Sequence, residues 1–268
     1  MDSHIEGGNA VRVAFVEWPE NLDAGGSAWQ EIEVGVALSR PDLLITNELP
    51  FGPWIAEAEV FDSTRADRSI QAHADGLEAL QSLGVPTIIT SRPVWSGDEL
   101  ANEAIAIEHG IVRPVHRKHY LPAEKGWNET VWYERSITGF LPTVLLSELA
   151  VGTMLCTDLM FNEHARRYGR SGTHLIAVPR ATGTNLQNWL TAGKMAAIVS
   201  GCYVVSSNRV GSASGGTVFG GGGYAFDPTG ALISVTDSAN PIRVVDVQPA
   251  KAAESHLNYP SYVEELAR

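Results

Sequence analysis

The sequence contains only two cysteines, Cys156 and Cys202, among its 268 residues. Two cysteines cannot form the set of several disulfides that stabilises many small secreted proteins. The sequence also has no apolar run long enough to cross a bilayer, and its first residues, MDSHIEGGNA, lack the apolar segment of a signal peptide. We therefore expect a cytoplasmic protein whose thiols stay reduced, preceded by a disordered or artificial leader over residues 1–10.

Positive charge is scarce as well. The chain carries 19 Lys and Arg against 31 Asp and Glu, which gives a formal net charge of −12. Nucleic acids and anionic membranes repel such a protein, so we expect neither as a partner. The composition, 44% hydrophobic and 19% charged, is that of a globular protein with an ample core. Because no linker divides the chain, we expect one domain over residues 11–268.

Short β-branched and apolar runs alternate with segments of helical periodicity, which predicts an α/β protein. The expected helices are 22–39, 69–83, 162–170, 188–200 and 251–258. The expected strands are 11–17, 42–46, 85–90, 100–107, 110–116, 174–178 and 202–206, together with a strand pair of 140–147 and 150–155. The C-terminal part, with the turn Asp227–Gly230, is expected to add strands on both sides of that turn. The simplest architecture is a four-layer α-β-β-α sandwich of two mixed sheets with outer helices. Residues 123–136 show no periodicity and predict a long, functional loop.

Three chemically capable side chains follow apolar strands: Glu48, Lys118 and Cys156. Cys156 follows the expected strand 150–155 at a helix start, where unpaired N–H groups would favour a thiolate. Each residue also has an ordinary interpretation, as a surface acid, a member of a solvated basic cluster or a core cysteine. Together they fit a thiol nucleophile, its base and a cation for the oxyanion.

The segments around these residues are Asn47–Pro50 (NELP), Arg117–Pro122 (RKHYLP) and Leu155–Asp158 (LCTD). They closely resemble the three signature blocks of the nitrilase superfamily of carbon–nitrogen hydrolases. Phe161–Glu163 with Arg166, the segment 202–211 and the turn Asp227–Gly230 resemble later parts of the same family. The resemblance extends over roughly residues 11–247.

The resemblance implies that Glu48, Lys118 and Cys156 form a catalytic triad. Cys156 would attack the carbonyl or nitrile carbon, Lys118 would stabilise the oxyanion, and Glu48 would move the protons. An acyl-thioester would form and be hydrolysed by water, with no metal and no cofactor. A second carboxylate is common in the family, and Glu129 is the expected one, with Glu134 and Glu124 as competitors.

Further candidates for supporting or substrate-binding roles are Thr157, Arg180 and Trp132. Arg180 follows a strand and would bind a substrate carboxylate or pair with a structural acid. Trp132, together with Trp54, Trp127 and Trp189, would line an apolar acyl pocket or belong to the core or an interface.

The Thr157–Asp158 pair after the cysteine is more similar to the amidase branches than to true nitrilases. We expect hydrolysis of a small-molecule amide, with nitrile or N-carbamoyl hydrolysis as the alternatives. A metal site of His109, His116, His119 and His164 is disfavoured because the spacing fits no common zinc pattern. The resemblance and the apolar candidates Phe140 and Tyr133 predict a homodimer or a larger homo-oligomer.

Overall fold

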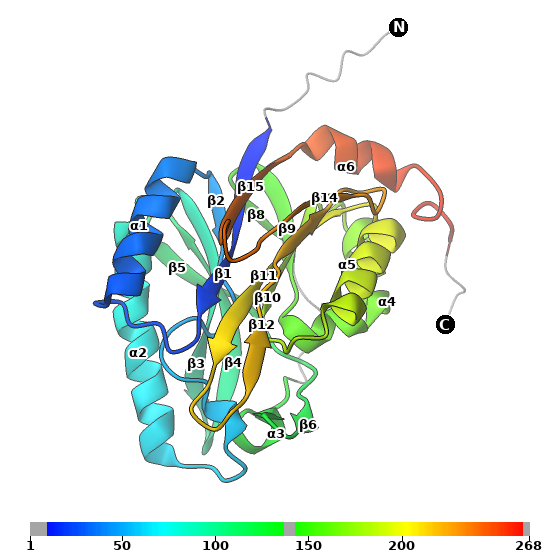
Figure 1. The fold of residues 1–268 in the computed structure, drawn as a ribbon. Coiled ribbons are helices and arrows are strands. Elements are labelled where there is room, and N and C mark those ends of the chain that lie inside the picture. Colours follow the sequence, from blue (N-terminus) through cyan, green and yellow to red (C-terminus); the bar gives the residue numbers. More distant parts are fainter. Residues whose placement is uncertain (1–9, 137–142, 265–268) are drawn as a thin grey trace, which may run out of the picture.

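A computed structural model describes residues 10–136 and 143–264 (Figure 1). Residues 1–9 of the expected leader and Phe140 lie outside the described residues. No helix of the described chain is long and apolar enough to span a membrane.

The helices lie close to their expected positions. They are α1 (Ser27–Ser39), α2 (Ser63–Ser82), α3 (Glu129–Trp132), α4 (Asn162–Arg170), α5 (Leu186–Ser200) and α6 (Pro249–His256), with two 3-10 turns, η1 (Ile55–Glu57) and η2 (Cys156–Met160). Helix α2 begins six residues earlier than expected because the Asp62 carboxylate caps it, accepting hydrogen bonds from two backbone N–H groups. Gly201 ends α5 in the left-handed conformation that glycine adopts easily.

The strands of the first half are β1 (Val11–Pro19), β2 (Leu43–Ile45), β3 (Thr87–Ser96), β4 (Glu99–Glu108) and β5 (Ile111–Arg117). Those of the second half are β8 (Val144–Leu146), β9 (Leu149–Thr153), β10 (Leu175–Arg180), β11 (Tyr203–Ser212), β12 (Val218–Gly220), β13 (Tyr224–Phe226), β14 (Leu232–Val235) and β15 (Ile242–Val247). The hairpin β4–β5 turns at His109 and Gly110 as expected.

The two halves form one hydrogen-bonded path, in the order β5-β4-β3-β2-β1-β11-β10-β9-β8, whereas separate sheets were expected. They join where the end of β1 pairs in parallel with β11, at Glu17–Pro19. The beginning of β1 pairs instead with β15, over Val11–Val16. Strand β1 is nine residues long, which is enough for its two ends to pair with different strands. The two halves therefore meet at β1.

Helices cover the outside of both halves (Figure 1). Helices α1 and α2 pack on the first half, with Trp29, Val36 and Leu80 in one apolar cluster. Helices α4 and α5 pack on the second half, with Tyr168 and Ala196 in another. A third cluster combines residues of β1–β4 with residues of β9–β11, so the two halves share an apolar core.

Residues 123–136 are more ordered than the expected long loop. They contain a small hairpin of β6 (Ala123–Glu124) and β7 (Trp127–Asn128), followed by α3. Periodicity cannot reveal strands of two residues or a helix of four. Trp132 and Tyr133 are buried in an apolar cluster, so Tyr133 does not provide the exposed apolar surface expected of it.

Candidate active site

Glu48 lies in the turn after β2 and is fully buried. Its Oε1 accepts hydrogen bonds from Lys118 Nζ and from Asn102 Nδ2, both at 2.8 Å. Its Oε2 is buried and has no hydrogen-bond partner among the described residues. A buried carboxylate oxygen without a donor is available to accept a proton from a nearby acid. Asn102, on β4, is a site residue that the sequence analysis missed.

The turn that carries Glu48 is held from β11. The Arg209 guanidinium donates to the carbonyl oxygens of Glu48 and Leu49, and it forms an ion pair with Glu20. Leu49 has a φ of +46°, in the region that non-glycine residues seldom adopt. These contacts fix the carbonyl groups of a strained turn, so they determine where the Glu48 side chain starts.

Lys118 follows β5 and lies between two carboxylates. Its Nζ is 2.8 Å from Glu48 Oε1 and 2.8 and 2.6 Å from the two oxygens of Glu129. Burial lowers the pKa of Lys118, but the charges of Glu129 and Glu48 more than offset this, and the pKa lies well above its usual value. Lys118 is therefore a fixed cation in the interior.

Glu129, at the start of α3, is the second carboxylate of this cluster. Its pKa is raised to about 8, mainly by burial and also by the charge of Glu48, while the charge of Lys118 lowers it. The two competitors lie elsewhere: Glu134 contacts Ser96 and Arg117, and Glu124 lines a cavity described below. Of these three, Glu129, the carboxylate expected from the sequence, is the one that contacts Lys118.

Cys156 is the first residue of η2 and is only 3% exposed. Its φ of +48° is unusual for a residue with a side chain, and such strain is common at functional sites. Burial raises the pKa of its thiol, and so do the charges of Glu48 and Glu129, while Lys118 lowers it. Burial therefore opposes the thiolate that the helix start was expected to favour, and the thiol needs a base, the role predicted for Glu48.

Asp158 links the cysteine segment to the lysine segment. Its Oδ2 accepts from Leu155 N–H at 3.1 Å and pairs with His116 Nε2 at 2.7 Å, and its Oδ1 accepts from His119 and Tyr120 N–H, both at 3.1 Å. Burial raises its pKa, but the bond to His116 and nearby positive charge hold the pKa below its usual value. One buried anion thus fixes both segments; it is a second residue that the sequence analysis missed.

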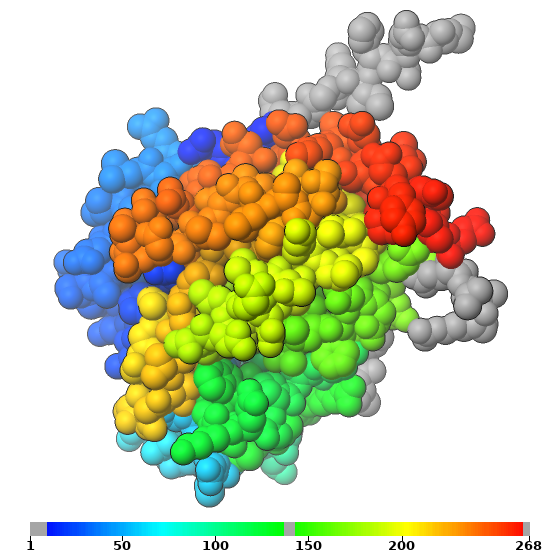
Figure 2. Space-filling view, turned by 45° about the vertical axis from the view of Figure 1, so that its right-hand side comes forward, coloured from blue at the N-terminus to red at the C-terminus, as the bar shows by residue number. Residues whose placement is uncertain are grey.

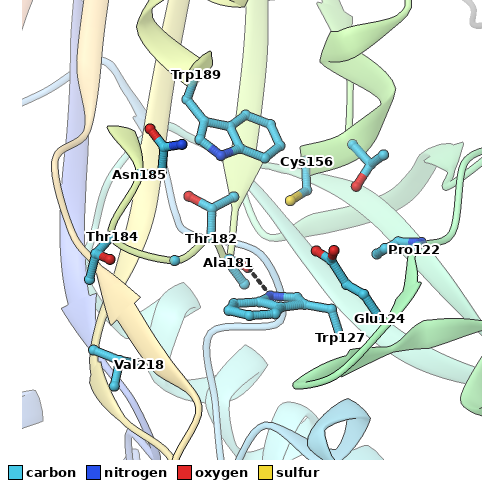
Figure 3. A pocket seen from close by; sticks show the side chains of 12 residues that line it. Pro122, Glu124, Trp127, Cys156, Ala181, Thr182, Thr184, Asn185, Trp189 and Val218 are labelled. Atoms are coloured by element: carbon cyan, nitrogen blue, oxygen red, sulfur yellow. Dashed lines mark hydrogen bonds between the residues drawn. The ribbon is translucent and has the colours of Figure 1, made fainter. Parts of the chain in front are cut away.

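A cavity of about 370 Å³ opens at Cys156. This volume suits a small organic molecule. It is lined by Pro122, Glu124, Trp127, Cys156, Thr157, Ala181, Thr182, Gly183, Thr184, Asn185, Trp189 and Val218 (Figure 3). In Figure 2 the segments that contribute these residues meet on one face: the green 123–128 hairpin, the yellow-green start of α5 and amber β12.

The supporting candidates have different positions. Thr157 lines the cavity, as do Trp127 and Trp189. Trp132 does not, because it is fully buried and donates its indole N–H to the Ala58 carbonyl oxygen. Trp54 is likewise buried, and its indole N–H donates to the Gly126 carbonyl oxygen. Of the four tryptophans considered for the acyl pocket, two therefore belong to the core.

Arg180 lies behind the cavity wall and is fully buried. Its guanidinium donates to Ser206 Oγ, Thr182 Oγ1 and the Gly222 carbonyl oxygen, and it stacks on the Trp189 and Tyr224 rings. Burial lowers its pKa. The expected pairing with a structural acid is not found among the described residues, and Arg180 instead supports two side chains of the cavity.

Two of the four histidines considered as metal ligands, His116 and His119, lie close together. Single ligand atoms of His116, His119 and Asp158 lie within 4.8 Å of one another. Both Asp158 oxygens already accept hydrogen bonds from N–H groups, as described above, and His116 stacks on His119 with ring centroids 5.1 Å apart. These hydrogen bonds to Asp158 hold the lysine segment in place. That the histidines bind no metal remains a prediction.

The comparisons with known proteins identify the family. A family model described as carbon–nitrogen hydrolase matches residues 18–256, most of the chain. The chain belongs to this family. Two curated relatives of this carbon–nitrogen hydrolase are an (R)-stereoselective amidase of a Pseudomonas species, 25% identical over 189 residues, and a beta-ureidopropionase of Arabidopsis thaliana, 28% identical over 128 residues. These matches cover 68% and 46% of this chain but only 65% and 31% of the relatives.

Solved structures have the same fold. A carbon–nitrogen hydrolase of Helicobacter pylori G27 superposes with a TM-score of 0.82 at 19% identity, covering 96% of this chain and 95% of the other. The amidase of Nesterenkonia sp. AN1 gives a TM-score of 0.74 at 20% identity, covering 91% and 95%. The resemblance to amidases of the nitrilase superfamily, expected from three short blocks, is confirmed.

Proposed function

We propose that this carbon–nitrogen hydrolase cleaves a small-molecule amide to a carboxylic acid and ammonia, with Glu48, Lys118 and Cys156 as the catalytic residues. The observation that carries the proposal is the buried Oε2 of Glu48, which has no hydrogen-bond partner in the described part of the chain, in a carboxylate whose charge raises the pKa of the Cys156 thiol. A neutral thiol at the base of a substrate-sized cavity needs such an acceptor before it can attack.

In the first step Glu48 takes the proton of the Cys156 thiol as sulfur attacks the amide carbon. The negative charge that develops on the carbonyl oxygen is stabilised by Lys118 Nζ and by the backbone N–H of Thr157, at the start of η2. Lys118 is suited to this role because two carboxylates keep it charged and in place. Glu129 orients Lys118 and does not contact the substrate.

In the second step the C–N bond breaks and Glu48 returns its proton to the leaving nitrogen, so that ammonia departs and an acyl-thioester remains on Cys156. Glu48 then accepts a proton from water, whose oxygen attacks the thioester carbon. The proton passes to the Cys156 sulfur as the C–S bond breaks, and the carboxylic acid is released. Every atom of the amide and of one water is accounted for, and no cofactor takes part.

The relatives support the amide over the alternatives. One curated relative is an amidase, and a solved structure of a mutant Nesterenkonia amidase shows covalent addition of the acetamide moiety of fluoroacetamide at its active-site cysteine. The beta-ureidopropionase matches a shorter part of this chain. Release of carboxylic acid from a nitrile, but not from the matching amide, would favour nitrile hydrolysis instead.

The test is to measure ammonia release from a panel of amides by wild-type protein, Cys156→Ala and Cys202→Ala. Cys202 is also buried but lies in the second-half core, so its variant controls for the loss of a buried thiol. We expect Cys156→Ala to release no ammonia above background, Cys202→Ala to remain active, and mass spectrometry to find an acyl adduct on wild-type Cys156 only. Undiminished hydrolysis by Cys156→Ala would remove the proposal.

We infer three further properties at this level. The shared core between two helix-covered halves supports a four-layer α-β-β-α sandwich.

The exposed apolar side chains of β14, Leu232, Ile233 and Val235, support a homodimer or larger homo-oligomer, and a monomer in light scattering at micromolar concentration would contradict it. The two free cysteines support a reducing, cytoplasmic location.

A further inference from the structure

The cavity at Cys156 contains a carboxylate that the reaction does not use. Glu124 lines the cavity, is solvent-exposed, and its carboxylate forms no hydrogen bond with another residue of the described chain. Figure 3 shows its carboxylate directed toward the space between the Cys156 sulfur and the Trp127 indole. Glu129, not Glu124, is bonded to Lys118, so Glu124 has no part in orienting the catalytic lysine.

The hairpin β6–β7 fixes the carboxylate beside an aromatic ring. Glu124 and Trp127 are paired across the two strands, a position in which side chains on one face are close neighbours. Trp127 is anchored by its indole N–H, which donates to the Ala181 carbonyl oxygen at 2.8 Å. Gly126 makes the tight turn possible, with a φ of +88°.

The cavity therefore offers the two features that recognise an organic cation: a carboxylate and the faces of half-buried indoles. Trp189 lines the wall opposite the hairpin (Figure 3). The described residues that line the cavity include no lysine or arginine, and Lys118 behind it is paired with two carboxylates. The net charge of −12 also favours the approach of a cation.

Arg180 is the group that could favour the opposite charge. It lies behind Trp189 and Thr182, does not line the cavity, and already donates to Ser206, Thr182 and Gly222. A substrate carboxylate would have to displace these contacts, whereas an ammonium group meets Glu124 directly. The geometry thus favours a cation on the hairpin side.

We propose that the amide substrate carries a protonated amine on its acyl chain, which Glu124 and Trp127 bind while the amide carbon lies at Cys156. This inference rests on the proposed amide hydrolysis and adds the substrate class. Neutral acyl chains of the same length fill the same space but leave the carboxylate in water.

The experiment compares two isosteric amides, δ-aminovaleramide, which ends in an ammonium group, and hexanamide, which ends in a methyl group. We expect wild-type protein to have the higher kcat/KM for δ-aminovaleramide. Glu124→Gln should lower that value by up to about fivefold, the upper range for a solvent-accessible ion pair, and by clearly more than its effect on hexanamide, which should stay within about twofold. Glu254→Gln, an exposed acid on α6, removes the same charge elsewhere and should change neither.

Charge reversal gives a second readout. Glu124→Lys should favour glutaramic acid, whose chain ends in a carboxylate, over δ-aminovaleramide. A wild-type preference for hexanamide or glutaramic acid, or an equal effect of Glu124→Gln on both isosteres, would overturn the inference while leaving amide hydrolysis intact.

Failure of the proposed function is recognised separately, because then none of the amides is hydrolysed. In that case pentylamine should still slow alkylation of Cys156 by iodoacetamide in wild-type protein and do so less in Glu124→Gln. Equal protection in the two proteins would overturn the cation site on its own.

Discussion

At the scale of single residues, the site depends on buried charged side chains that form ion pairs and hydrogen bonds with one another. Lys118 has two carboxylate partners, and Asp158 accepts four N–H groups from two segments. Buried ions are costly unless they are paired and fully hydrogen-bonded, which both of these are. The distance between the lysine and cysteine segments is therefore set by electrostatics as well as by packing.

Asp158→Asn should damage stability and activity together. An amide presents N–H groups where one carboxylate oxygen now accepts two hydrogen bonds, so buried donors lose their acceptor. Breaking a buried ionic network of this kind costs about 3 kcal/mol of unfolding free energy. Urea unfolding measures that loss, and kcat/KM should fall because Leu155 and His119 lose their common anchor.

Asp98→Asn, an exposed acid in the β3–β4 turn, is the matched control and should change neither quantity. If Asp158→Asn unfolds at the same urea concentration as wild-type protein, Asp158 does not link the two segments as described.

At the scale of elements, close approaches between backbones determine how the helices sit. Gly169 on α4 faces the end of α5, and a Cβ there would lie 2.0 Å from the Ser200 carbonyl oxygen. Gly152 on β9 faces the Tyr168 ring in the same way, at 2.4 Å. In the second half of the protein, α4, α5 and β9 can therefore pack closely only because glycine occupies positions 152 and 169. Strand β9 is the strand that precedes Cys156.

Gly169→Ala should destabilise the protein although alanine is the better helix former. Helix propensity gains about 1 kcal/mol, but the added methyl group contacts backbone that cannot rotate away, and overpacking costs about 1–3 kcal/mol. We expect a lower melting temperature in thermal unfolding followed by circular dichroism.

Gly35→Ala on α1 is the control, because its Cβ would meet only the movable end of Ile242, at 2.7 Å. This variant should be as stable as wild-type protein or more so. Equal melting temperatures for the two alanine variants would show that the α4–α5 approach is not tight.

At the scale of the whole molecule, burial of neutral histidines makes stability depend on pH. The pKa of His73 falls from 6.5 to about 4, mainly because the ring is buried, and burial also lowers the pKa values of His116, His164, His174 and His256. In the unfolded chain these rings bind protons at higher pH than in the folded protein. Acid therefore favours the unfolded state.

We expect the contribution of these histidines to the free energy of unfolding to be complete above about pH 6.5 and to be lost as the pH drops toward about 4. For His73 the unfolded chain binds a proton throughout this window and the folded protein does not, which corresponds to about 3 kcal/mol. Urea unfolding between about pH 7 and about pH 4.5 measures the slope, and His73→Gln should reduce it.

His109→Asn is the control because His109 is exposed in a turn, and it should leave the slope unchanged. Identical slopes in wild-type protein and His73→Gln would contradict the assignment of acid sensitivity to this buried ring.

The sequence by itself determined the order of most elements and the identity of Glu48, Lys118 and Cys156 as the residues to examine. Apolar runs, glycine stops and short motifs are local signals, and local signals survive in the chain without its fold. Helix α4 and the hairpin turn at His109 and Gly110 lie as predicted for this reason.

Only the tertiary structure decided which side chains meet. Asn102 and Arg209 reach the site from other strands, and Asp158 bonds the distant lysine segment. Trp132 lies in the core, and Glu124 faces the cavity. The protonation of Cys156 was likewise undecided by sequence, because burial of the thiol depends on residues distant in the chain. Contacts, desolvation and charge coupling are properties of arrangement in space, and a linear pattern does not encode them locally.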